Sequence, residues 1–265
     1  MKMIGYNHLG KNGRLGNQMF QYATTRGIAA KKGYDFIIPD SDFRDQWNDH
    51  QLFDAFEMTG VKNIGFIDGE YYKEPDNHSH IYSEDYVNKC PDNVSLYGYF
   101  QTEKYFSHIS DEIRKDFTFK KEILNPCKEA FDFKEVLSLH VRRSDYLSAH
   151  NVSFHGNCGS DYYQNALAQF DSDLPVIIFS DDTEWCKQQE IFKPERFLIS
   201  ETGNNLMDLC LMTMCTHHII ANSSFSWWGA WLANSQNVVA PKQWYGPAGS
   251  HQSTQDLYLS HWKVL

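Results

Sequence analysis

The sequence lacks any CxxC pair and any regular spacing of its cysteines, which lie at 90, 127, 158, 186, 210 and 215. This scatter argues against a disulfide framework or a zinc site and favours buried free thiols. The sequence also has no apolar run near the roughly 20 residues that span a bilayer, and its first residues lack the apolar stretch of a signal peptide. We therefore expect a soluble, intracellular protein.

Positive charge is scarce as well. The 265 residues carry a formal net charge of -10, with 42% hydrophobic and 22% charged residues. A duplex-binding protein needs a basic face, so nucleic acid is excluded as the main partner, and any basic site must be local. The composition is that of a globular protein with one large domain or two ordinary ones.

Short apolar runs alternate with helical patterns through the second half of the chain. Alternation of this length predicts βαβ crossovers and a parallel sheet. The predicted strands are 136–141, 176–179, 196–199, 217–221 and 238–240, and the predicted helices are 160–170, 183–189, 204–215 and 225–233.

The first half opens in the same way but is less regular. A strand at 3–6 leads into a helix over 17–31, which Gly33 ends as a left-handed cap. Residues 120–126 carry charge and a proline, so we place a domain boundary there and predict domains at 1–125 and 126–265.

Polar clusters follow three of the predicted strands. They are Arg142-Arg143-Ser144-Asp145, Ser180-Asp181-Asp182 and Asn222-Ser223-Ser224. Ligands of open parallel sheets bind beyond the carboxyl ends of the strands, so we expect these cationic, acidic and hydroxyl-rich groups to meet there. Together they suit a nucleotide.

Each cluster matches one part of a nucleotide. Arginine presents N–H donors that fit phosphate oxygens, so Arg142 and Arg143 are candidates for a pyrophosphate. The carboxylate of Asp181 or Asp182 matches the paired N–H donors of guanine.

The segment NSSFSWWGAWL at 222–232 combines hydroxyls with tryptophans. Ser223 and Ser224 lie where a helix begins, so they and the first N–H groups of that helix are candidates for the second phosphate. Trp227, Trp228 and Trp231 recur at helical spacing, which favours a role in the core.

Structural alternatives stay open for the charged groups. Arg142 and Arg143 with Asp145 also fit a surface salt bridge. The pair Asp181 and Asp182 also fits an N-cap with acidic residues in the first turn.

A metal site is a further alternative. Asp40-Ser-Asp42 and Asp171-Ser-Asp173 match the short Asp-x-Asp pattern with which many sugar-nucleotide enzymes hold a divalent cation. Two carboxylates at this spacing are common in an acidic chain, and the second pair precedes its strand, at the wrong end of the sheet.

Five motifs in order resemble the α-1,2-fucosyltransferases of glycosyltransferase family 11, as found in bacterial surface-glycan loci. The family pattern has Gly where this chain has Ser144, which affects the local loop geometry alone. The motifs are GRLGNQMFQYA at 13–23, GYFQTEKYF at 98–106, HVRRSDYL at 140–147, FSDD at 179–182 and IIANSSFSWWGAWL at 219–232.

The resemblance implies an α/β fold of the GT-B type, with two Rossmann-like domains facing a cleft. It assigns 1–125 to the acceptor and 126–265 to the donor, GDP-β-L-fucose, and it implies no metal and no other cofactor. Transfer with inversion would place α-L-fucose on the 2-hydroxyl of a terminal galactose.

The resemblance also implies which residues form the site. Arg142 and Asn17 are the expected catalytic residues. The expected donor-binding residues are Gly16, Gln18, His140, Arg142, Arg143, Asp145, Asp181, Asp182, Asn222, Ser223, Ser224 and Phe225.

The chemistry of the leaving group follows from its charge. Cleavage of the C1–O bond leaves negative charge on GDP, so Arg142 and the helix that begins near Ser224 would stabilise the departing pyrophosphate without a cation. Inversion also requires a base on the opposite face of the sugar. Asp40, Asp42 and Asp45 are candidates that the sequence does not separate.

Two other functions remain to be tested against this one. A metal-dependent glycosyltransferase would use Asp40 and Asp42, and a glycan-binding protein without catalysis would use the many aromatic residues. For the fucosyltransferase, acceptor recognition is expected within residues 40–95. The expected location is cytoplasmic, with peripheral contact at the inner membrane if the acceptor is lipid-linked.

Overall fold

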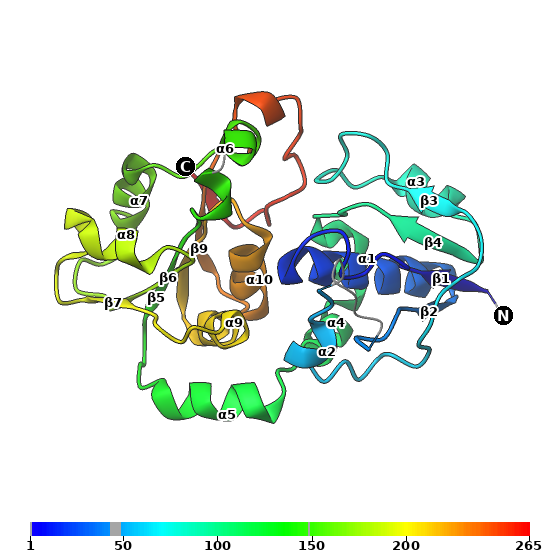
Figure 1. The fold of residues 1–265 in the computed structure, drawn as a ribbon, viewed down its shortest axis with the longest axis horizontal. Helices are drawn as coiled ribbons and strands as arrows, with labels where there is room; N and C mark the ends of the chain where they lie inside the picture. Colours follow the sequence, from blue (N-terminus) through cyan, green and yellow to red (C-terminus); the bar gives the residue numbers. More distant parts are fainter. Residues whose placement is uncertain (1, 43–48, 148) are drawn as a thin grey trace. The chain divides into compact units, whose positions relative to one another are not determined.

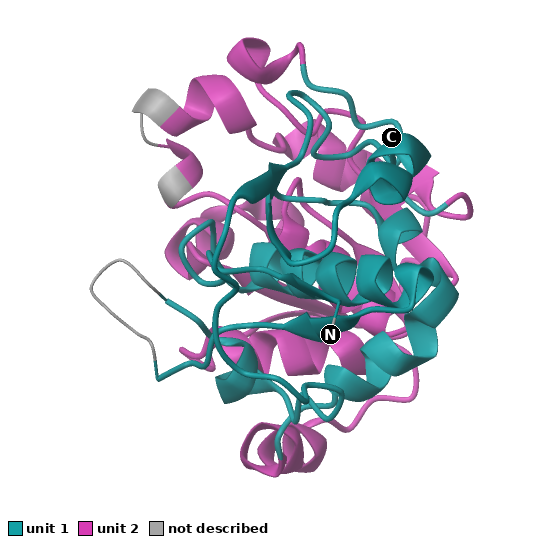
Figure 2. Ribbon diagram, turned by 90° about the vertical axis from the view of Figure 1, so that its right-hand side faces the viewer, with its two compact units in different colours: residues 1–120, 252–259 teal, residues 121–251, 260–265 magenta. Residues whose placement is uncertain are grey.

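The computed structural model describes residues 2–42, 49–147 and 149–265, with the side chains at 145, 149 and 150 left out of the description. The chain divides into two compact units (Figure 2). Unit 1 comprises residues 1–120 and 252–259, and unit 2 comprises residues 121–251 and 260–265. The division at 120 lies close to the predicted boundary, but the return of 252–259 to unit 1 was not predicted.

Unit 1 is built on a parallel sheet. Within its described residues, the sheet is four-stranded with the order β2-β1-β4-β3, and α1 packs against β1 and β2 (Figure 1). The elements are β1 (Met3–Gly5), α1 (Leu15–Lys32), β2 (Asp35–Ile37), α2 (Leu52–Ala55), β3 (Tyr71–Lys73), α3 (Glu84–Lys89), β4 (Val94–Tyr97), the 3-10 turns Glu103–Tyr105 and Ser107–Ile109, and α4 (Ser110–Asp116).

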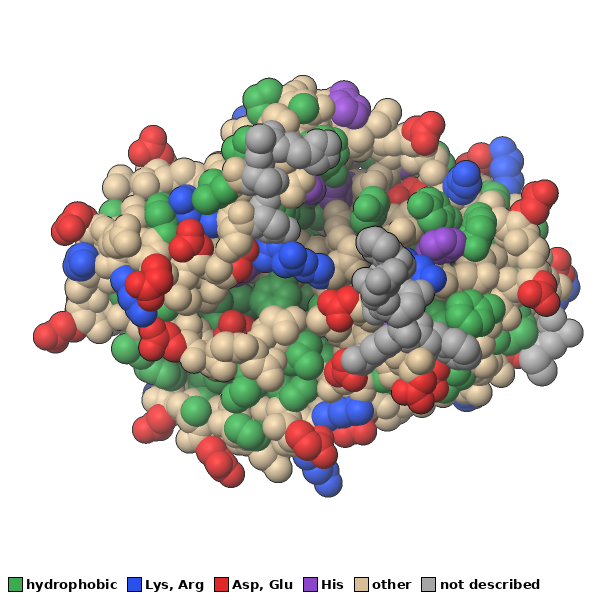
Figure 3. Space-filling view, viewed as in Figure 1, with side chains coloured by type: hydrophobic (Ala, Val, Ile, Leu, Met, Phe, Trp, Pro, Cys, Tyr) green, Lys and Arg blue, Asp and Glu red, His purple; other side chains and the backbone are tan. Residues whose placement is uncertain are grey.

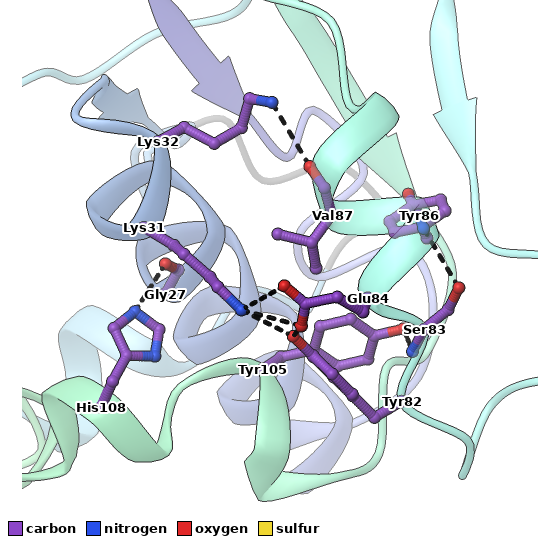
Figure 4. Close-up of polar contacts among 10 residues, drawn as sticks. All are labelled: Gly27, Lys31, Lys32, Tyr82, Ser83, Glu84, Tyr86, Val87, Tyr105 and His108. Atoms are coloured by element: carbon purple, nitrogen blue, oxygen red, sulfur yellow. Dashed lines mark hydrogen bonds and ion pairs between the residues drawn. The ribbon is translucent and has the colours of Figure 1, made fainter.

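The C-terminal end of α1 is fixed by a cap and by polar contacts with the segment that leads into α3 (Figure 4). Gly33 has a φ of 66°, and its N–H reaches the last carbonyls of the helix, which confirms the predicted left-handed cap. The ammonium of Lys31 donates to the Tyr82 hydroxyl at 2.8 Å and to Glu84 Oε2 at 2.9 Å. These contacts join the end of α1 to the start of α3.

Unit 2 contains the regular alternation that the sequence predicted. Its sheet is six-stranded and parallel within the described residues, with the order β10-β9-β8-β5-β6-β7. The elements are α5 (Lys121–Ala130), β5 (Leu137–Val141), the 3-10 turn Asp145–Leu147, α6 (Ala149–His155), α7 (Ser160–Leu167), β6 (Val176–Ser180), α8 (Thr183–Gln188), the 3-10 turn Glu190–Phe192, β7 (Phe197–Ile199), α9 (Asn205–Met214), β8 (His217–Ile219), α10 (Ser224–Leu232), β9 (Asn237–Ala240), the 3-10 turn Pro247–Gly249 and β10 (Lys263–Val264).

The segment at which the sequence places the domain boundary is largely helical. Residues 121–130 form α5 with Pro126 inside it. Ile123 and Cys127 lie one turn apart, are buried, and face the side on which α5 packs against α9. This burial stabilises the helix despite the proline, because most helical stability in proteins comes from packing.

The tryptophans of α10 lie in the core, as the helical spacing predicted. Trp227 and Trp228 are fully buried, and Trp231 is 2% exposed. The Trp227 ring also packs on Trp262, at 5.6 Å between centroids, just before the last strand of the chain. These aromatic contacts fasten α10 to the sheet of unit 2.

The cysteines agree with a further prediction. All six cysteines are free and buried. Among the described residues, no helix has both the length and the apolar character that a bilayer span requires.

Candidate functional site

The carboxyl ends of β8, β5 and β6 lie side by side, because these strands are neighbours in the sheet of unit 2. Val141 at the end of β5 pairs with Ser180 at the end of β6, and Leu139 pairs with Ile219 of β8. The sheet therefore brings the three polar clusters of unit 2 to one edge. This is the place where open parallel sheets bind ligands.

Two partly buried ion pairs occupy the edge between β5 and β6. Arg142 Nη1 lies 3.0 Å from Asp181 Oδ2, and Arg143 Nε donates to Asp182 Oδ2 at 3.2 Å. The backbone N–H of Arg143 donates to Asp181 Oδ1 at 2.9 Å. The arginines are therefore held in ion pairs, as in the salt-bridge alternative, but their partners are Asp181 and Asp182. The side chain of Asp145, the partner named in that alternative, lies outside the described part.

Asp182 also serves as the N-cap of α8. Its Oδ1 accepts the Trp185 N–H at 3.1 Å, and its own N–H donates to Ser180 Oγ at 2.9 Å. The second structural alternative, an N-cap, thus describes Asp182 in this structure. A guanine contact for either aspartate stays a prediction.

Aromatic rings support both arginines. The Arg143 guanidinium lies 4.0 Å from the centroid of the Trp185 ring, and the Arg142 guanidinium lies 5.3 Å from that of Tyr146. The Tyr146 hydroxyl donates to the Asn222 carbonyl at 3.2 Å, which links the β5 edge to the β8 edge. Sequence reasoning missed both rings. Tyr146 follows Arg142 by four residues, within the HVRRSDYL motif, and Trp185 follows Asp182 by three.

His140 is an internal residue of β5. It is 4% exposed, and its Nδ1 lies 2.9 Å from Ser226 Oγ of α10. Burial, and then the neighbouring Arg142, lower the pKa of His140 to about 3, so the imidazole is neutral. This contact aligns α10 with β5, and a direct contact between His140 and a ligand stays a prediction.

The cluster after β8 ties several loops to the start of α10. Asn222 is 2% exposed, and its amide donates to the carbonyls of His155 at 2.7 Å and Trp244 at 3.0 Å. Ser223 is the N-cap of α10, since its Oγ accepts the Phe225 N–H at 3.3 Å. The first turn of α10 carries no acidic residue, so the positive end of its dipole is not offset there.

In unit 1, the loop between β1 and α1 holds the GRLGNQ motif. Gly13 has a φ of 94°, and a Cβ there would lie 2.1 Å from the Asn17 side chain. Gln18 is fully buried and binds backbone: its Nε2 donates to the Asp49 carbonyl at 2.6 Å and its Oε1 accepts the Gln51 N–H at 2.9 Å. Gln18 therefore shapes the loop, and Gly16 is buried beside it.

Asn17 is bound by a residue of the second motif. Gln101 Nε2 donates to Asn17 Oδ1 at 2.6 Å, and Gln101 Oε1 lies 2.6 Å from His80 Nε2. Burial lowers the pKa of His80 to about 4, so the ring is neutral near pH 7 and donates this bond. Two motifs that are 84 residues apart in the sequence thus meet at Asn17.

The acidic candidates in unit 1 differ in their surroundings. Asp40 Oδ1 accepts from the Ser41 hydroxyl at 3.3 Å and from the Asp42 N–H at 3.4 Å, within one turn. Asp42 is exposed, and Asp45 lies outside the described residues. Glu74, which sequence reasoning missed, accepts the N–H groups of Tyr99 at 2.7 Å and Phe100 at 2.9 Å.

Carboxylates are dispersed rather than clustered. The described residues contain no group of three or more His, Cys, Asp or Glu side chains with the placement of metal ligands. Asp171 Oδ1 accepts the Asp173 N–H at 2.8 Å, in a turn that precedes β6, so this pair lies at the amino end of the sheet. In Figure 3, acidic and basic side chains are interspersed over the face shown, in keeping with the prediction that positive charge is local.

Comparison with known sequences gives one family for the entire chain. The profile of glycosyl transferase family 11 matches residues 1–265. An α-1,2-colitosyltransferase of Escherichia coli is 32% identical over 88% of this chain and 90% of its own length. The O-antigen biosynthesis glycosyltransferase WbnK of Escherichia coli is 27% identical over 94% and 98%, and human galactoside α-(1,2)-fucosyltransferase 1 is 27% identical over 86% and 65%.

Comparison with solved structures gives the fold. The α-1,6-fucosyltransferase NodZ soaked with GDP-fucose superposes with a TM-score of 0.57 at 15% identity, covering 91% of this chain and 95% of that one. POFUT1 in complex with GDP-fucose superposes with a TM-score of 0.51 at 12% identity, covering 90% and 97%. The α/β, GT-B-type fold is therefore confirmed.

Proposed function

The chain belongs to glycosyl transferase family 11 and is a glycosyltransferase of the α-1,2-fucosyltransferase type, and from that premise we propose its donor, acceptor and stereochemistry. The donor is GDP-β-L-fucose, and the acceptor is the 2-hydroxyl of a terminal galactose. Transfer inverts the anomeric centre and uses no metal. Unit 2 binds the donor, and unit 1 carries the acceptor side together with Asn17.

The arginine pair at the β5 edge carries the proposal. Arg142 and Arg143 are oriented by the aspartates after β6 and by flanking rings, so their guanidinium groups are positioned before a ligand arrives. Preorganised donors aimed at developing negative charge usually supply the largest catalytic contribution. We assign to Arg142 the stabilisation of the departing pyrophosphate.

The start of α10 supplies the second part of the phosphate site. Ser223 and Ser224 place hydroxyls at a helix N-terminus whose first turn has no carboxylate. Phosphates bind at such N-termini because the backbone N–H groups point along the axis and the dipole favours negative charge. Asn222 precedes these serines after β8, and Phe225 follows them in α10, with its ring 5.8 Å from the His140 ring.

Asn17 acts from unit 1. Because Gln101 donates to its Oδ1, the Asn17 amide is oriented with its Nδ2 away from that bond. We propose that Asn17 donates to the phosphate or to the fucose ring during transfer, with Gly16 beside it. The base that receives the acceptor proton is one of Asp40, Asp42 and Asp45, and a dissociative transition state would need little help from it.

The test is release of GDP from GDP-fucose, with lactose or N-acetyllactosamine as acceptor, once in EDTA and once with manganese. Release that depends on acceptor and persists in EDTA is expected. Release with manganese alone would favour the metal-dependent alternative at Asp40 and Asp42. Failure to bind GDP would favour the glycan-binding alternative. A protein that binds GDP but releases none from GDP-fucose under either condition would mean that the acceptor or the base differs from those proposed.

Variants at the β5 edge refine this test. Arg142→Ala should lower kcat at least about 100-fold with little change in the melting temperature, because the lost guanidinium acts on the leaving group. Arg196→Ala is the matched control, since Arg196 also lies over an aromatic ring but precedes β7, at the amino edge of the same sheet. Turnover of Arg142→Ala within a few-fold of the wild type would refute the role of Arg142.

Colitose is a second candidate for the transferred sugar, because the α-1,2-colitosyltransferase relative is 32% identical. Colitose is L-fucose without its 3-hydroxyl. A site built to bind that hydroxyl rejects the analogue strongly, whereas a site without such a contact does not. Comparing kcat/KM for the two GDP-sugars decides between them, and we expect GDP-fucose to be preferred.

A cytoplasmic location stays part of the proposal. The galactose-terminated acceptor is either a free oligosaccharide or a lipid-linked one at the inner membrane. Assays with both forms of acceptor would distinguish them.

A further inference from the structure

Three aromatic rings form a corner on one face of the unit 1 sheet. His8 lies 4.8 Å from Tyr71 and 5.2 Å from Tyr97 between ring centroids, and the two tyrosines lie 5.9 Å apart. The His8 ring meets Tyr71 at 69° and Tyr97 at 88°. At such angles the edge of one ring meets the face of the next, so the three rings pack into one aromatic cluster.

The corner is open to solvent. Tyr71 is 42% exposed and Tyr97 is 37% exposed, and among the described residues neither hydroxyl has a hydrogen-bond partner. Tyrosine is ordinarily retained at surfaces where one end of the ring packs and the hydroxyl binds a partner. Both rings therefore keep surface on which a ligand can pack.

The corner carries no formal charge near neutral pH. Burial, and then the nearby Lys11 ammonium, lower the pKa of His8 below its ordinary value, so its imidazole is neutral. Beside it, Asn7 exchanges two hydrogen bonds with the backbone of Ile67, at 2.8 and 3.0 Å, which fixes the neighbouring loop. The ligand that suits the corner is therefore neutral, with apolar faces and polar edges.

The corner shares its loops with the site. His8 lies in the β1–α1 loop that leads to Gly13 and Asn17, and Tyr97 ends β4 just before the segment with Gln101. The bond between Gln101 and Asn17 joins these two loops. A ligand on the corner would therefore be held by the same two segments that position Asn17.

Glu74 makes the β4 loop rigid. Its carboxylate accepts two consecutive N–H groups after Gly98, and a Cβ on Gly98 would lie 2.4 Å from the Glu74 Cβ. The Gly98 carbonyl accepts the Tyr6 hydroxyl at 2.6 Å. The corner is thus preorganised, which reduces the entropy lost when a ligand binds.

We propose that the corner formed by His8, Tyr71 and Tyr97 binds a neutral pyranose of the acceptor oligosaccharide by stacking its C–H faces on the rings. The sugar hydroxyls at the edges of the pyranose bond with the tyrosyl hydroxyls. The inference rests on the proposed function and adds to it a location for acceptor recognition. Of the three residues, only Tyr71 lies inside the 40–95 region that the sequence indicated.

The test is steady-state kinetics of the double variant Tyr71→Ala/Tyr97→Ala with N-acetyllactosamine. We expect the KM for the acceptor to rise about tenfold or more, because two stacking surfaces are lost, while the KM for GDP-fucose changes less than twofold. Tyr71→Phe/Tyr97→Phe keeps the rings and should recover most of the loss, which separates stacking from hydrogen bonding. An acceptor KM within twofold of the wild type in the double alanine variant would overturn the proposal.

Tyr34→Ala is the matched control. Tyr34 is a partly exposed tyrosine of the same unit, but it precedes β2 at the opposite edge of the sheet. Its loss should leave both KM values unchanged. A rise in acceptor KM in this variant as well would mean that the effect is general to unit 1, and the proposal would fall.

A binding measurement separates the inference from the proposed function. If the wild type transfers no sugar to any galactoside, saturation-transfer NMR with N-acetyllactosamine still decides the matter. A signal in the wild type that is lost in the double alanine variant supports the corner as a sugar site. No signal in the wild type, or an equal signal in both proteins, refutes it.

Discussion

At the scale of single residues, charged side chains in this protein are oriented by neighbours that the sequence places far away. Arg142 follows β5, yet its carboxylate partner Asp181 follows β6. The ring beside Arg142 belongs to Tyr146, whose hydroxyl donates to the carbonyl of Asn222 after β8. Partly buried pairs of this kind contribute more to orientation than to net stability, because desolvation offsets most of the attraction. The arrangement suits a site that must keep a cation in one position.

Glu74 is a carboxylate whose position is costly. It lies beside Tyr6, Tyr86, Tyr99 and Tyr105, and in the described structure no cation is among its interacting groups. Burial raises the pKa of Glu74 to about 7, although the two N–H groups that it accepts lower the pKa. The folded state therefore holds a proton on Glu74 that the unfolded state has already released. Stability gained from this proton is complete below about pH 4.5 and is lost as the pH rises to about 7.

We expect the difference in unfolding free energy between the wild type and Glu74→Gln to fall by up to about 3 kcal/mol between pH 4.5 and 7, and to be level above pH 7.5. Glutamine does not titrate, so the subtraction cancels the contributions of other groups, including His80 and His140. Urea unfolding of both proteins across this range measures it. A difference that stays constant from pH 4.5 to 8 would show that Glu74 has an ordinary pKa.

At the scale of elements, local signals and packing decide different features. The strands and helices of unit 2 follow short apolar runs bounded by polar residues, so their presence was predictable within a few residues. The Gly33 cap was predictable for the same local reason. Helix α5 was not predictable, because its stability comes from packing Ile123 and Cys127 on α9. Strand β10 was not predictable either, because it has only two residues and is defined by its pairing with β9.

Helix α1 offers a case in which packing opposes propensity. Gly27 lies in the middle of this helix, where alanine would ordinarily be better by about 1 kcal/mol. A Cβ at Gly27 would lie 2.2 Å from the Tyr105 carbonyl oxygen and 2.9 Å from Phe106 Cα, both of them backbone atoms. The glycine therefore permits close packing of α1 on the 3-10 turn Glu103–Tyr105, which lies within the GYFQTEKYF motif.

We expect Gly27→Ala to lower the unfolding free energy by about 2 kcal/mol or more, because the clash outweighs the gain in helix propensity. Ala30→Gly is the matched control, since Ala30 is an exposed position of the same helix and should lose only about 1 kcal/mol from propensity. Urea denaturation measures both. Stabilisation by Gly27→Ala would show that α1 and the turn can separate at little cost.

At the scale of the whole molecule, the chain crosses between its two units more than once. Residues 252–259 return to unit 1, where Asp256 is 7% exposed and its Oδ2 accepts the Tyr82 N–H at 2.8 Å. Its Oδ1 lies 2.6 Å from the Lys104 ammonium. The last residues then rejoin unit 2 as β10, so neither unit is formed from one continuous segment.

We expect Asp256→Ala to destabilise the protein by about 1 to 3 kcal/mol, because it leaves the partly buried Tyr82 N–H without its acceptor and removes the partner of the half-exposed Lys104 ammonium. Hydrogen exchange should locate the loss of protection in unit 1, around residues 80–84, although the change is near the C-terminus. Asp92→Ala is the control: its pair with Lys2 spans 3.7 Å at exposed side chains and should contribute at most about 0.5 kcal/mol. Loss of protection confined to unit 2 would contradict this assignment.

The candidate site was predictable to the extent that it depends on strand order. Parallel strands direct the residues after their carboxyl ends to one edge, so the clusters after β5, β6 and β8 were expected to meet once the alternation was recognised. The partners within the site were not predictable. Pairing of Arg142 with Asp181, of Gln101 with Asn17 and of His140 with Ser226 depends on which side chains a given sheet order and register bring within hydrogen-bond distance.

The class of fold, the parallel alternation of unit 2, the buried thiols and the family follow from the sequence without coordinates, because each depends on local periodicity or on ordered motifs. The tertiary structure alone decided that 252–259 belongs to unit 1, that Glu74 lies beside the GYFQ loop and that His8, Tyr71 and Tyr97 form one corner. These contacts join residues that are far apart along the chain. The separation of two residues in the sequence does not indicate which of the many polar or aromatic side chains will meet. Only the packing of complete elements selects them.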